Sequence, residues 1–367
     1  MNKIKSSIEK LKFFANKNAN HISSGVFVLG FLLDAVSLPS VTSAWAYLTG
    51  LMYACIVGVL IFVNQYVKAK YFDIAISFFM GSLISFVFIY YLRGSDILTG
   101  WPVLLFILSI MIANEIISRK ARLLFNLIIY SITVTFLFVF LMPVVFRSMN
   151  DYVFISSLFV SGLFLYFFTK ALYYSSLSSQ QMTFTLLDNQ KYKYINKSIL
   201  FFKRFKYKIY NYIIITPVFI LVLYFTNIIP AVPLTLAEAN VYIKAIKISA
   251  SGLSSDYILE NKCKRGMNPL KPCYFNYDDI ANKKLSFYNE IQAPTSLTAK
   301  VTHKWESYNN LTKKWEQKAS ISYGIFGGRE NGYRGYTTIA NINRGLYRVT
   351  TIINDNRTLG SKKFEIR

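Results

Sequence analysis

The stretch IYNYIIITPVFILVLYFTNIIPAVPLTL, residues 209–236, divides the chain into two parts of different composition. Before Pro230, long apolar segments follow one another with short gaps, whereas the sequence after Pro230 has none. A run of about 18 or more apolar residues predicts a membrane-spanning helix, because about 20 residues at a rise of 1.5 Å cross the hydrocarbon core. The sequence therefore predicts a membrane-embedded N-terminal part and a polar C-terminal part.

Seven spans can be drawn in the N-terminal part. The first is the weakest, because it is short and carries Asp34. The basic segment Met1–Asn20 leads into it like the start of a signal peptide, and we expect an uncleaved signal anchor because many spans follow. The predicted spans are Ser23–Leu38, Val41–Asn64, Phe72–Leu92, Leu98–Ile117, Leu123–Phe146, Tyr152–Tyr173 and Ile209–Ile229.

The charge distribution predicts the orientation of these spans. The chain has 367 residues and a formal net charge of +23, and its bases cluster beside alternate span ends. The N-terminus, the loops near Lys68 and Arg119, and the connection 170–208 are basic, whereas the opposite loops contain only Arg93 and Arg147. The positive-inside rule places the basic loops in the cytoplasm. We therefore expect a multi-pass protein of a bacterial inner membrane, and no nucleic-acid partner, because the bases follow the topology.

These patterns predict three regions and one long loop. Residues 1–22 form a cytoplasmic basic N-terminus, residues 23–230 a seven-helix domain, and residues 231–367 a periplasmic or extracellular β-rich domain. The basic cytoplasmic loop lies near 174–208. Its second half interleaves bases with aromatic residues, so an amphipathic segment on anionic lipid is one interpretation. A plain positive-inside loop is the interpretation we favour.

The C-terminal part has the alternation of β-strands. From Leu297 to Trp305, apolar and polar residues alternate with a period of two, which predicts a half-buried strand. Shorter runs of the same kind surround Ile321 and Val349. Several short strands separated by turn residues predict an all-β, sandwich-like domain, with immunoglobulin-like connectivity as one possibility.

The membrane part contains two ionisable residues worth attention, because buried charges are costly and are often functional. Asp34 lies toward the predicted outer end of the first span and Glu115 toward the inner end of the fourth, so they are not expected to form a proton relay. Asp34 is the intramembrane polar candidate, with Arg93, Arg147 or a helix end as its expected partner. Glu115 has Arg119 one helical turn away.

The glycine-rich stretch GIFGGRENGYRGY, residues 324–336, is the most distinctive part of the β-rich domain. No Gly-Lys-Ser/Thr follows, so it is not a phosphate loop. Arginine beside tyrosine suits a sugar or an acidic group, which makes Arg329, Tyr333, Arg334 and Tyr336 binding candidates. A hairpin connection whose aromatic rings pack on the sheet is the alternative, and we favour it.

Several short motifs of the C-terminal part together resemble the bacterial domain of unknown function numbered 2914, in its membrane-anchored form. The domain proper corresponds to about residues 297–367, and Gly30–Asp34 resembles a segment of the membrane region. Tyr347 stands where tryptophan is expected. The resemblance implies an architecture and no activity. Its motifs are Ile229–Leu234, His303–Trp305, Gly327–Arg329, Gly332–Tyr336, Gly345–Val349, Leu359-Gly360 and Phe364–Ile366.

Cysteines and histidines offer little chemistry. Cys263 and Cys273 share the exported part and are too far apart for a CxxC site, so we expect a structural disulfide, with two reduced thiols as the alternative. Cys55 lies in a span and is expected to be inert. His303 shares the apolar face of its strand with Trp305, which favours a core histidine, and it is also a binding candidate. With two histidines in the chain, we expect no multi-histidine metal site, and we predict no cofactor and no catalytic residue.

The leading hypothesis is a non-enzymatic membrane protein that presents a β-sandwich outside the cytoplasm and binds an envelope component, namely a glycan, a lipid head group or a protein. An envelope-modifying enzyme is the second hypothesis, with Asp34, His303, Arg329 or Arg334 as contributors. A transporter is the third. A deep outer-face cavity with convergent polar groups would favour the enzyme, and exposed Arg/Tyr clusters would favour binding.

Overall fold

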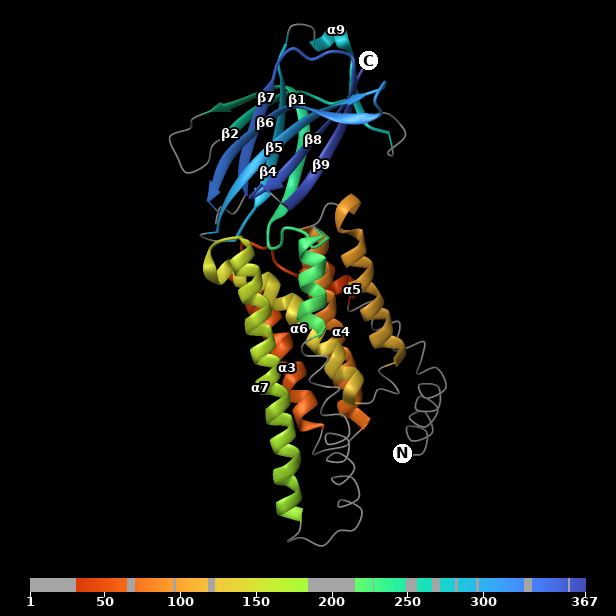
Figure 1. Cartoon of the computed structure of the whole chain (residues 1–367), viewed down its shortest axis with the longest axis vertical. Helices are drawn as coiled ribbons and strands as arrows, with labels where there is room; N and C mark the ends of the chain where they lie inside the picture. The colour runs from red at the N-terminus through yellow and green to blue at the C-terminus, as the bar shows by residue number, and fades with distance from the viewer. Residues whose placement is uncertain are drawn as a thin grey trace, which may run out of the picture.

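The N-terminal half of the chain is helical and the C-terminal part is β-rich (Figure 1). The structure is a computed structural model. It describes residues 31–64, 70–94, 97–117, 123–183, 215–226, 228–248, 256–265, 271–280, 283–294, 297–326, 332–355 and 357–367.

The described part of the bundle has five long helices, with a short helix at 31–37 before them and the helix Ile215–Phe225 after them. Tyr130 and Tyr91 are buried, and their hydroxyls donate to the carbonyls of Ala54 and Phe136, at 3.0 Å and 3.1 Å. Such bonds satisfy polar groups that lipid would leave unpaired. The long helices are α3 (Ala44–Val63), α4 (Lys70–Arg93), α5 (Ile97–Ile117), α6 (Leu123–Phe146) and α7 (Asp151–Thr183).

Four stretches of the described helices are long and apolar enough to cross a membrane. The length and composition of the described helices therefore do not support the predicted number of seven membrane spans. Two further apolar helices, Gly100–Ile116 and Ile215–Phe225, are shorter, and parts of the first and seventh predicted spans lie outside the described residues. The four are Ala44–Val63, Ala75–Arg93, Leu123–Phe146 and Asp151–Ser175.

The helix α7 continues ten residues beyond its predicted end at Tyr173, to Thr183. The ten residues after Tyr173 contain no glycine or proline, so nothing in the local sequence stops the helix. Loss of hydrophobicity ends a membrane span, but it does not end a helix. The long helix is visible in Figure 1 as the one that extends farthest from the β-rich domain.

The β-rich part consists of two sheets, with strand orders β2-β1-β4-β7 and β3-β9-β8-β5-β6. All pairs are antiparallel except β3 with β9. The strands are β1 (Thr235–Ile248), β2 (Asp256–Lys262), β3 (Cys273–Phe275), β4 (Leu285–Gln292), β5 (Thr298–Asn309), β6 (Lys314–Phe326), β7 (Tyr333–Ile339), β8 (Gly345–Ile353) and β9 (Arg357–Ile366), with the short helix α9 (Tyr277–Ile280) after β3.

Side chains from both sheets share one core. Phe287 of β4 lies with Trp305, Val349 and Phe364 of the other sheet in a buried cluster. The alternation from Leu297 onward follows the prediction, since the apolar members are buried and Thr298 and Lys300 are exposed. The strand order differs from the immunoglobulin order ABED and CFG, since the described sheets have four and five strands and β3 pairs in parallel with β9.

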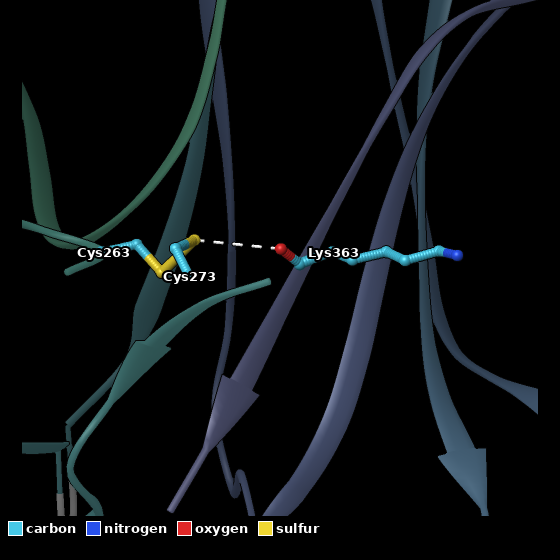
Figure 2. The surroundings of a disulfide bond; sticks show 3 residues. All are labelled: Cys263, Cys273 and Lys363. Carbon is cyan, nitrogen blue, oxygen red and sulfur yellow. Dashed lines mark hydrogen bonds between the residues drawn. A yellow bond between two sulfur atoms is a disulfide. The ribbon is translucent and has the colours of Figure 1, made fainter. Parts of the chain in front are cut away.

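A disulfide joins Cys263 and Cys273, whose Cα atoms are 5.6 Å apart (Figure 2). The Cys263 amide donates to the Val241 carbonyl of β1, and Cys273 belongs to β3, which pairs with β9. The Sγ of Cys273 also lies 3.8 Å from the Lys363 carbonyl oxygen. The bridge therefore ties the edge of one sheet to the edge of the other. Disulfides persist in oxidising compartments, which agrees with the expected export of this part.

We predict that Cys273→Ser lowers the free energy of unfolding of the β-rich part by about 2–3 kcal/mol, the chain-entropy value for so short a loop. Mass spectrometry of unreduced, thiol-blocked protein should recover the two cysteine peptides linked. Cys55→Ser, which changes a cysteine of α3, is the control and should leave unfolding unchanged. Recovery of both Cys263 and Cys273 as alkylated thiols would reject the bridge.

Candidate functional site

The helices and the β-rich part meet through backbone hydrogen bonds. The turn between α6 and α7 reaches the start of β5, where the amide and the hydroxyl of Thr298 both donate to the Arg147 carbonyl at 3.2 Å. The Asn354 side chain donates to the Met149 carbonyl. The connection 229–234 contributes to both cores, since Val232 packs with the helices and Leu234 with the sheets.

A cavity of about 590 Å³ lies at this junction. The helices with their connecting turn, and the β-rich part, each contribute both apolar and polar residues to its wall. From the helices and their ends come Val139, Pro143, Val153, Phe154 and Tyr224, with Asn150 and Asp151; from the β-rich part come Thr298, Lys300, Gly324, Ile325, Ile353, Asn354 and Arg357.

Arg357 and two aromatic rings form a stack in this wall. The Phe154 and Tyr224 rings are parallel, with centroids 3.5 Å apart, and the Arg357 guanidinium carbon lies 3.4 Å from the Tyr224 centroid. Two groups so close to one ring must occupy opposite faces, so Tyr224 lies between Phe154 and Arg357. Arg357 Nη1 also donates to the Tyr224 carbonyl at 2.6 Å, and the Tyr224 hydroxyl donates to Asp151 Oδ1 at 2.8 Å.

Arg357 is 7% exposed, and its Nε and Nη2 atoms have no hydrogen-bond partner among the described residues. A guanidinium carries five N–H donors and remains charged. A buried charge without a counter-ion, and a buried donor without an acceptor, both raise the free energy of the folded state. Arg357 is thus the residue of the cavity wall that is least satisfied by the protein itself.

The other polar groups of the wall have partners. Lys300 Nζ lies 2.8 Å from Asp355 Oδ2, and the Lys300 amide donates to Asn354 Oδ1 at 2.9 Å. Asn150 Oδ1 accepts from the Val153 amide at 2.8 Å and caps α7, and Asp151 lies in the first turn of that helix. These contacts hold the junction together, and the unpartnered Nε and Nη2 atoms of Arg357 are buried within it.

His303 lies between the two sheets and is fully buried. Its ring nitrogens lie 2.8 Å from Asn289 Nδ2 and 2.9 Å from Thr337 Oγ1, and Trp305 Nε1 donates to the same Thr337 oxygen. Burial lowers the pKa of His303 from its usual 6.5 to about 3. The structure therefore places His303 as a neutral, hydrogen-bonded core residue.

The other predicted binding residues are not gathered in one cleft. Arg334 and Thr337 are three positions apart in β7, so their side chains point to opposite faces, and only Thr337 reaches His303. Arg334 Nε pairs with Glu290 Oε2 at 3.3 Å. Tyr336 lies edge-on to Tyr257, with ring centroids 5.9 Å apart.

The remaining residues of the glycine-rich stretch are accounted for as follows. Tyr333 lies parallel to Tyr323 at 6.3 Å, whereas Arg329 lies outside the described residues. These contacts correspond to the alternative in which the aromatic residues of the stretch pack on the sheet.

Asp34 lies near the end of the bundle that faces the β-rich part. The Tyr53 hydroxyl donates to its Oδ1 at 3.5 Å. The guanidinium of Arg93, an expected partner, donates instead to the carbonyls of Ala35, Leu38 and Pro39 at 3.0–3.3 Å. Arg93 thus satisfies backbone carbonyls at the C-terminal end of the short helix 31–37.

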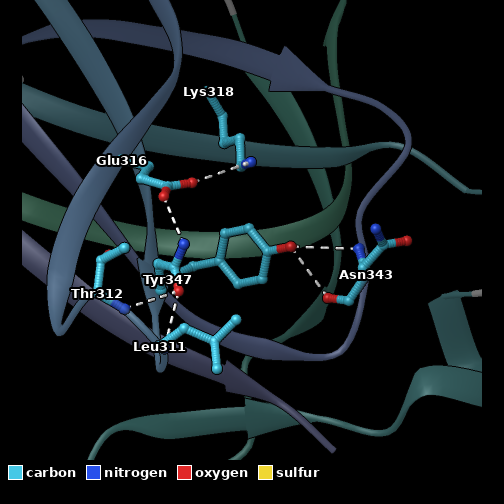
Figure 3. Close-up of polar contacts among 7 residues, drawn as sticks. Leu311, Thr312, Glu316, Lys318, Asn343 and Tyr347 are labelled. Atoms are coloured by element: carbon cyan, nitrogen blue, oxygen red, sulfur yellow. Dashed lines mark hydrogen bonds and ion pairs between the residues drawn. The ribbon is translucent and has the colours of Figure 1, made fainter.

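A second hollow, of about 540 Å³, lies on the β-rich part beside the loop from β7 to β8. Figure 3 shows polar groups at its edge. The Tyr347 hydroxyl donates to the Asn343 carbonyl at 3.0 Å, and Glu316 lies 3.9 Å from Lys318. Asn309 Oδ1 accepts from the amides of the following turn. These groups satisfy one another and shape the turn and the loop.

The comparisons with known proteins concern the C-terminal part. Residues 298–366 match a family described as "Protein of unknown function (DUF2914)". The predicted resemblance is confirmed for this region. The matched residues span the strands β5 to β9, and the family description names no activity. A membrane anchor is suggested only by the apolar helices.

Other comparisons add no functional information. No curated protein matches the chain. One solved structure, the Pseudomonas fluorescens alkylpurine DNA glycosylase AlkC bound to DNA containing an abasic site analog, is 11% identical. The alignment covers 90% of this chain and 100% of that chain, with a TM-score of 0.22. A likeness this weak carries no argument about fold or function.

The residues of the junction cavity were not predicted from the sequence. Asp151, Tyr224 and Arg357 belong to three separate segments, and no motif links them. The available signals were indirect. Asp151 follows Arg147, which the predicted topology places in an outer loop, and Arg357 follows the polar residues 354–356.

We predict that the β-rich part loses stability as the pH falls from about 6.5 toward 3. The unfolded chain binds a proton at His303 near pH 6.5, whereas the folded chain binds it only near pH 3, so acid favours unfolding in this window. His303→Gln should reduce the pH dependence of the unfolding free energy, by up to about 1.4 kcal/mol per pH unit. Denaturant unfolding of residues 231–367 between pH 7 and 4 measures this pH dependence.

The control for this titration is Val301→Ala, which weakens the same strand and leaves His303 in place. This variant should lower the free energy of unfolding at every pH and keep the wild-type dependence of that free energy on pH. An unchanged slope in His303→Gln would show that other groups, such as Glu306, whose pKa is lowered by hydrogen bonds from Lys304 and Arg348 against the opposing effect of burial, account for the acid sensitivity.

Proposed function

We propose that this chain is a multi-pass protein of a bacterial inner membrane that binds an envelope component at the junction of its helices and its β-rich part. In this proposal seven spans cross the membrane, the N-terminus lies in the cytoplasm, and residues 231–367 form a sandwich-like domain in the periplasm or outside the cell. The observation that carries the proposal is the junction cavity, whose wall is built by both parts of the chain.

The location of the cavity favours an amphiphile among the envelope components. The apolar helices end where the β-rich part begins, so a membrane around the helices would place the cavity at the boundary between hydrocarbon and water. Val139, Val153 and Phe154 offer apolar contact on the helix side, and Thr298, Lys300 and Asn354 offer polar contact on the other. Ligand sites are typically apolar pockets with a few placed polar groups.

The same geometry gives less support to catalysis, even though a cavity with polar groups exists. Acid–base chemistry needs a titratable group with reach to a reacting atom. Asp151 accepts from Tyr224, and Lys300 pairs with Asp355, so both are engaged by the protein. His303 is in the core. Binding in the cavity is therefore a better-supported function than catalysis.

The proposed orientation makes a prediction for reporter fusions. A reporter that is active only after export should be active when fused after Arg367 and inactive when fused after Gln190, because the positive-inside rule places these positions on opposite sides. A cytoplasmic reporter should give the inverse pattern. Activity of the export reporter at both positions would contradict the seven-span topology.

Occupancy of the cavity can be tested with Gly324→Phe. A Cβ at Gly324 would meet no atom within 4 Å, so the new ring would enter open space at the cavity wall without a backbone clash. We expect native mass spectrometry of the full chain in nonionic detergent to find a bound amphiphile on the wild type, and several-fold less of it on Gly324→Phe.

Ser320→Phe is the matched control, because it adds the same ring to the same face of β6, four residues away and outside the cavity wall. It should keep the wild-type occupancy. Equal occupancy of wild type and Gly324→Phe would remove the cavity as the binding site.

A further inference from the structure

We infer that the β-rich part lies on the membrane surface through Phe326, the last residue of β6, whose ring contacts the lipid head-group layer beside the helices. This contact goes beyond the ligand proposed for the junction cavity and rests only on the proposal that the helices cross a membrane. Three observations lead to it: the exposed aromatic residues at one end of the bundle, the position of Phe326 beside that end, and the outward direction of its side chain.

Exposed aromatic residues mark the end of the bundle that faces the β-rich part. Trp45, Trp101 and Tyr152 lie near the starts of α3, α5 and α7, and all three are exposed. These helices start at the junction. The helix α4, which lies between α3 and α5 in the chain, ends there with Gly94 close to the Leu234 carbonyl, and the start of α7 lines the junction cavity. Tryptophan and tyrosine are enriched where a membrane meets water, because their rings are apolar and their N–H or O–H groups are polar. One surface of the membrane therefore lies at this end of the helices.

Phe326 lies beside this end of the bundle. Its partner across β5 and β6 is Thr298, which forms a β-bridge with Ser148 in the turn between α6 and α7. The Thr298 amide donates to the Arg147 carbonyl of the same turn at 3.2 Å. Phe326 is thus one strand spacing, about 4.8 Å, from a residue that is bonded to the turn. In Figure 1 this is the end of the β-rich part that faces the helices. The head-group layer extends about 5–7 Å beyond the hydrocarbon core, so it reaches a side chain at this height.

The side chain of Phe326 points away from the core of the β-rich part. Its neighbour Ile325 is buried between the sheets, and successive side chains of a strand point to opposite faces. Phe326 is 60% exposed, and Val145 and Phe146 at the end of α6 are exposed as well. Large exposed apolar side chains therefore lie on both sides of one hydrogen-bonded turn, which indicates a shared apolar environment. A lipid bilayer provides this environment, because the apolar surface of the helix Leu123–Phe146 continues up to the turn.

The test places single cysteines in the full chain, in phospholipid nanodiscs. Cys55→Ser is the background, and the Cys263–Cys273 bridge stays intact. Each new cysteine carries the fluorophore NBD. A nitroxide attached to lipids near the head group quenches a probe in that layer, whereas iodide quenches a probe in water. We expect the probe of Phe326→Cys to be quenched strongly by the lipid nitroxide and weakly by iodide.

Two further positions are the controls. Leu311→Cys is the matched control, because Leu311 is 95% exposed in the turn between β5 and β6, at the opposite end of the same hairpin. Its probe should show the reverse, with several-fold more quenching by iodide and several-fold less by the lipid nitroxide. Phe159→Cys tests the span itself, because Phe159 is exposed in the middle of α7. A nitroxide attached deeper in the acyl chain should quench its probe.

A second readout uses the wild-type chain and does not depend on the folding of a variant. A photoactivatable lipid with its reactive group near the head group is included in the nanodisc, and the illuminated protein is digested with trypsin. We expect the label in the peptide 319–329, which contains Phe326, and several-fold less of it in the peptide 305–313, which contains Leu311.

The contrary outcomes are distinct. If the Phe326 probe behaves like the probe of Leu311, the inference is overturned, and quenching at Phe159 in the same preparation leaves the proposed membrane spans standing. Protection of the Phe326 probe from iodide without quenching by lipid would assign this residue to a protein contact and would also overturn the inference. A lack of lipid quenching at Phe159 overturns both the inference and the proposed multi-pass topology.

Discussion

The contact between Arg357 and Tyr224 is the constraint on which the arrangement of the two parts depends. Arg357 begins β9, the strand that lies between β3 and β8, and its guanidinium covers the ring and bonds the carbonyl of a residue at the end of the last helix. Phe154 of α7 covers the other face of that ring. One side chain thus connects the DUF2914 region to two helices. Because the stack is planar and its partners are buried, it restricts both the distance and the rotation between sheet and helix in a way that a surface salt bridge would not.

The polar contacts around the stack reinforce the same geometry. The turn from α6 to α7 bonds the start of β5, and the connection 229–234 places Val232 among the helices and Leu234 among the strands. Gly94 allows this close approach, since a Cβ there would lie 2.8 Å from Val232 and 2.9 Å from the Leu234 carbonyl. The two parts are thus joined at three places: the turn from α6 to α7, the connection 229–234, and the stack of Arg357 on Tyr224. Between these places, space remains wherever side chains do not fill it. The cavity is therefore a consequence of how the two parts are joined.

The sequence predicted the local features of the fold better than the long-range ones. The helix Leu123–Phe146 and the alternation after Leu297 follow from hydrophobicity at a short period, which each segment carries by itself. The strand order and the junction depend on which segments meet. Asp151 and Arg357 lie 73 and 133 residues from Tyr224, and no sequence pattern at either position predicts its contact with Tyr224. The candidates chosen from the sequence, Arg334 and Tyr336, came from a distinctive composition that the structure explains by a salt bridge and ring packing.

Two buried polar side chains, His303 and Arg357, differ in how the protein satisfies them. His303 is neutral when buried, and Asn289, Thr337 and Tyr323 surround its ring nitrogens, so the core satisfies it completely. Arg357 cannot give up its charge, and the described residues satisfy one of its three nitrogens. A buried polar group is normally paired, and an unpaired one needs a reason. For His303 the pairing marks a structural residue. For Arg357 the Nε and Nη2 atoms are buried without a partner, and the stack on Tyr224 together with the bond to the Tyr224 carbonyl is the contact that joins β9 to the helices.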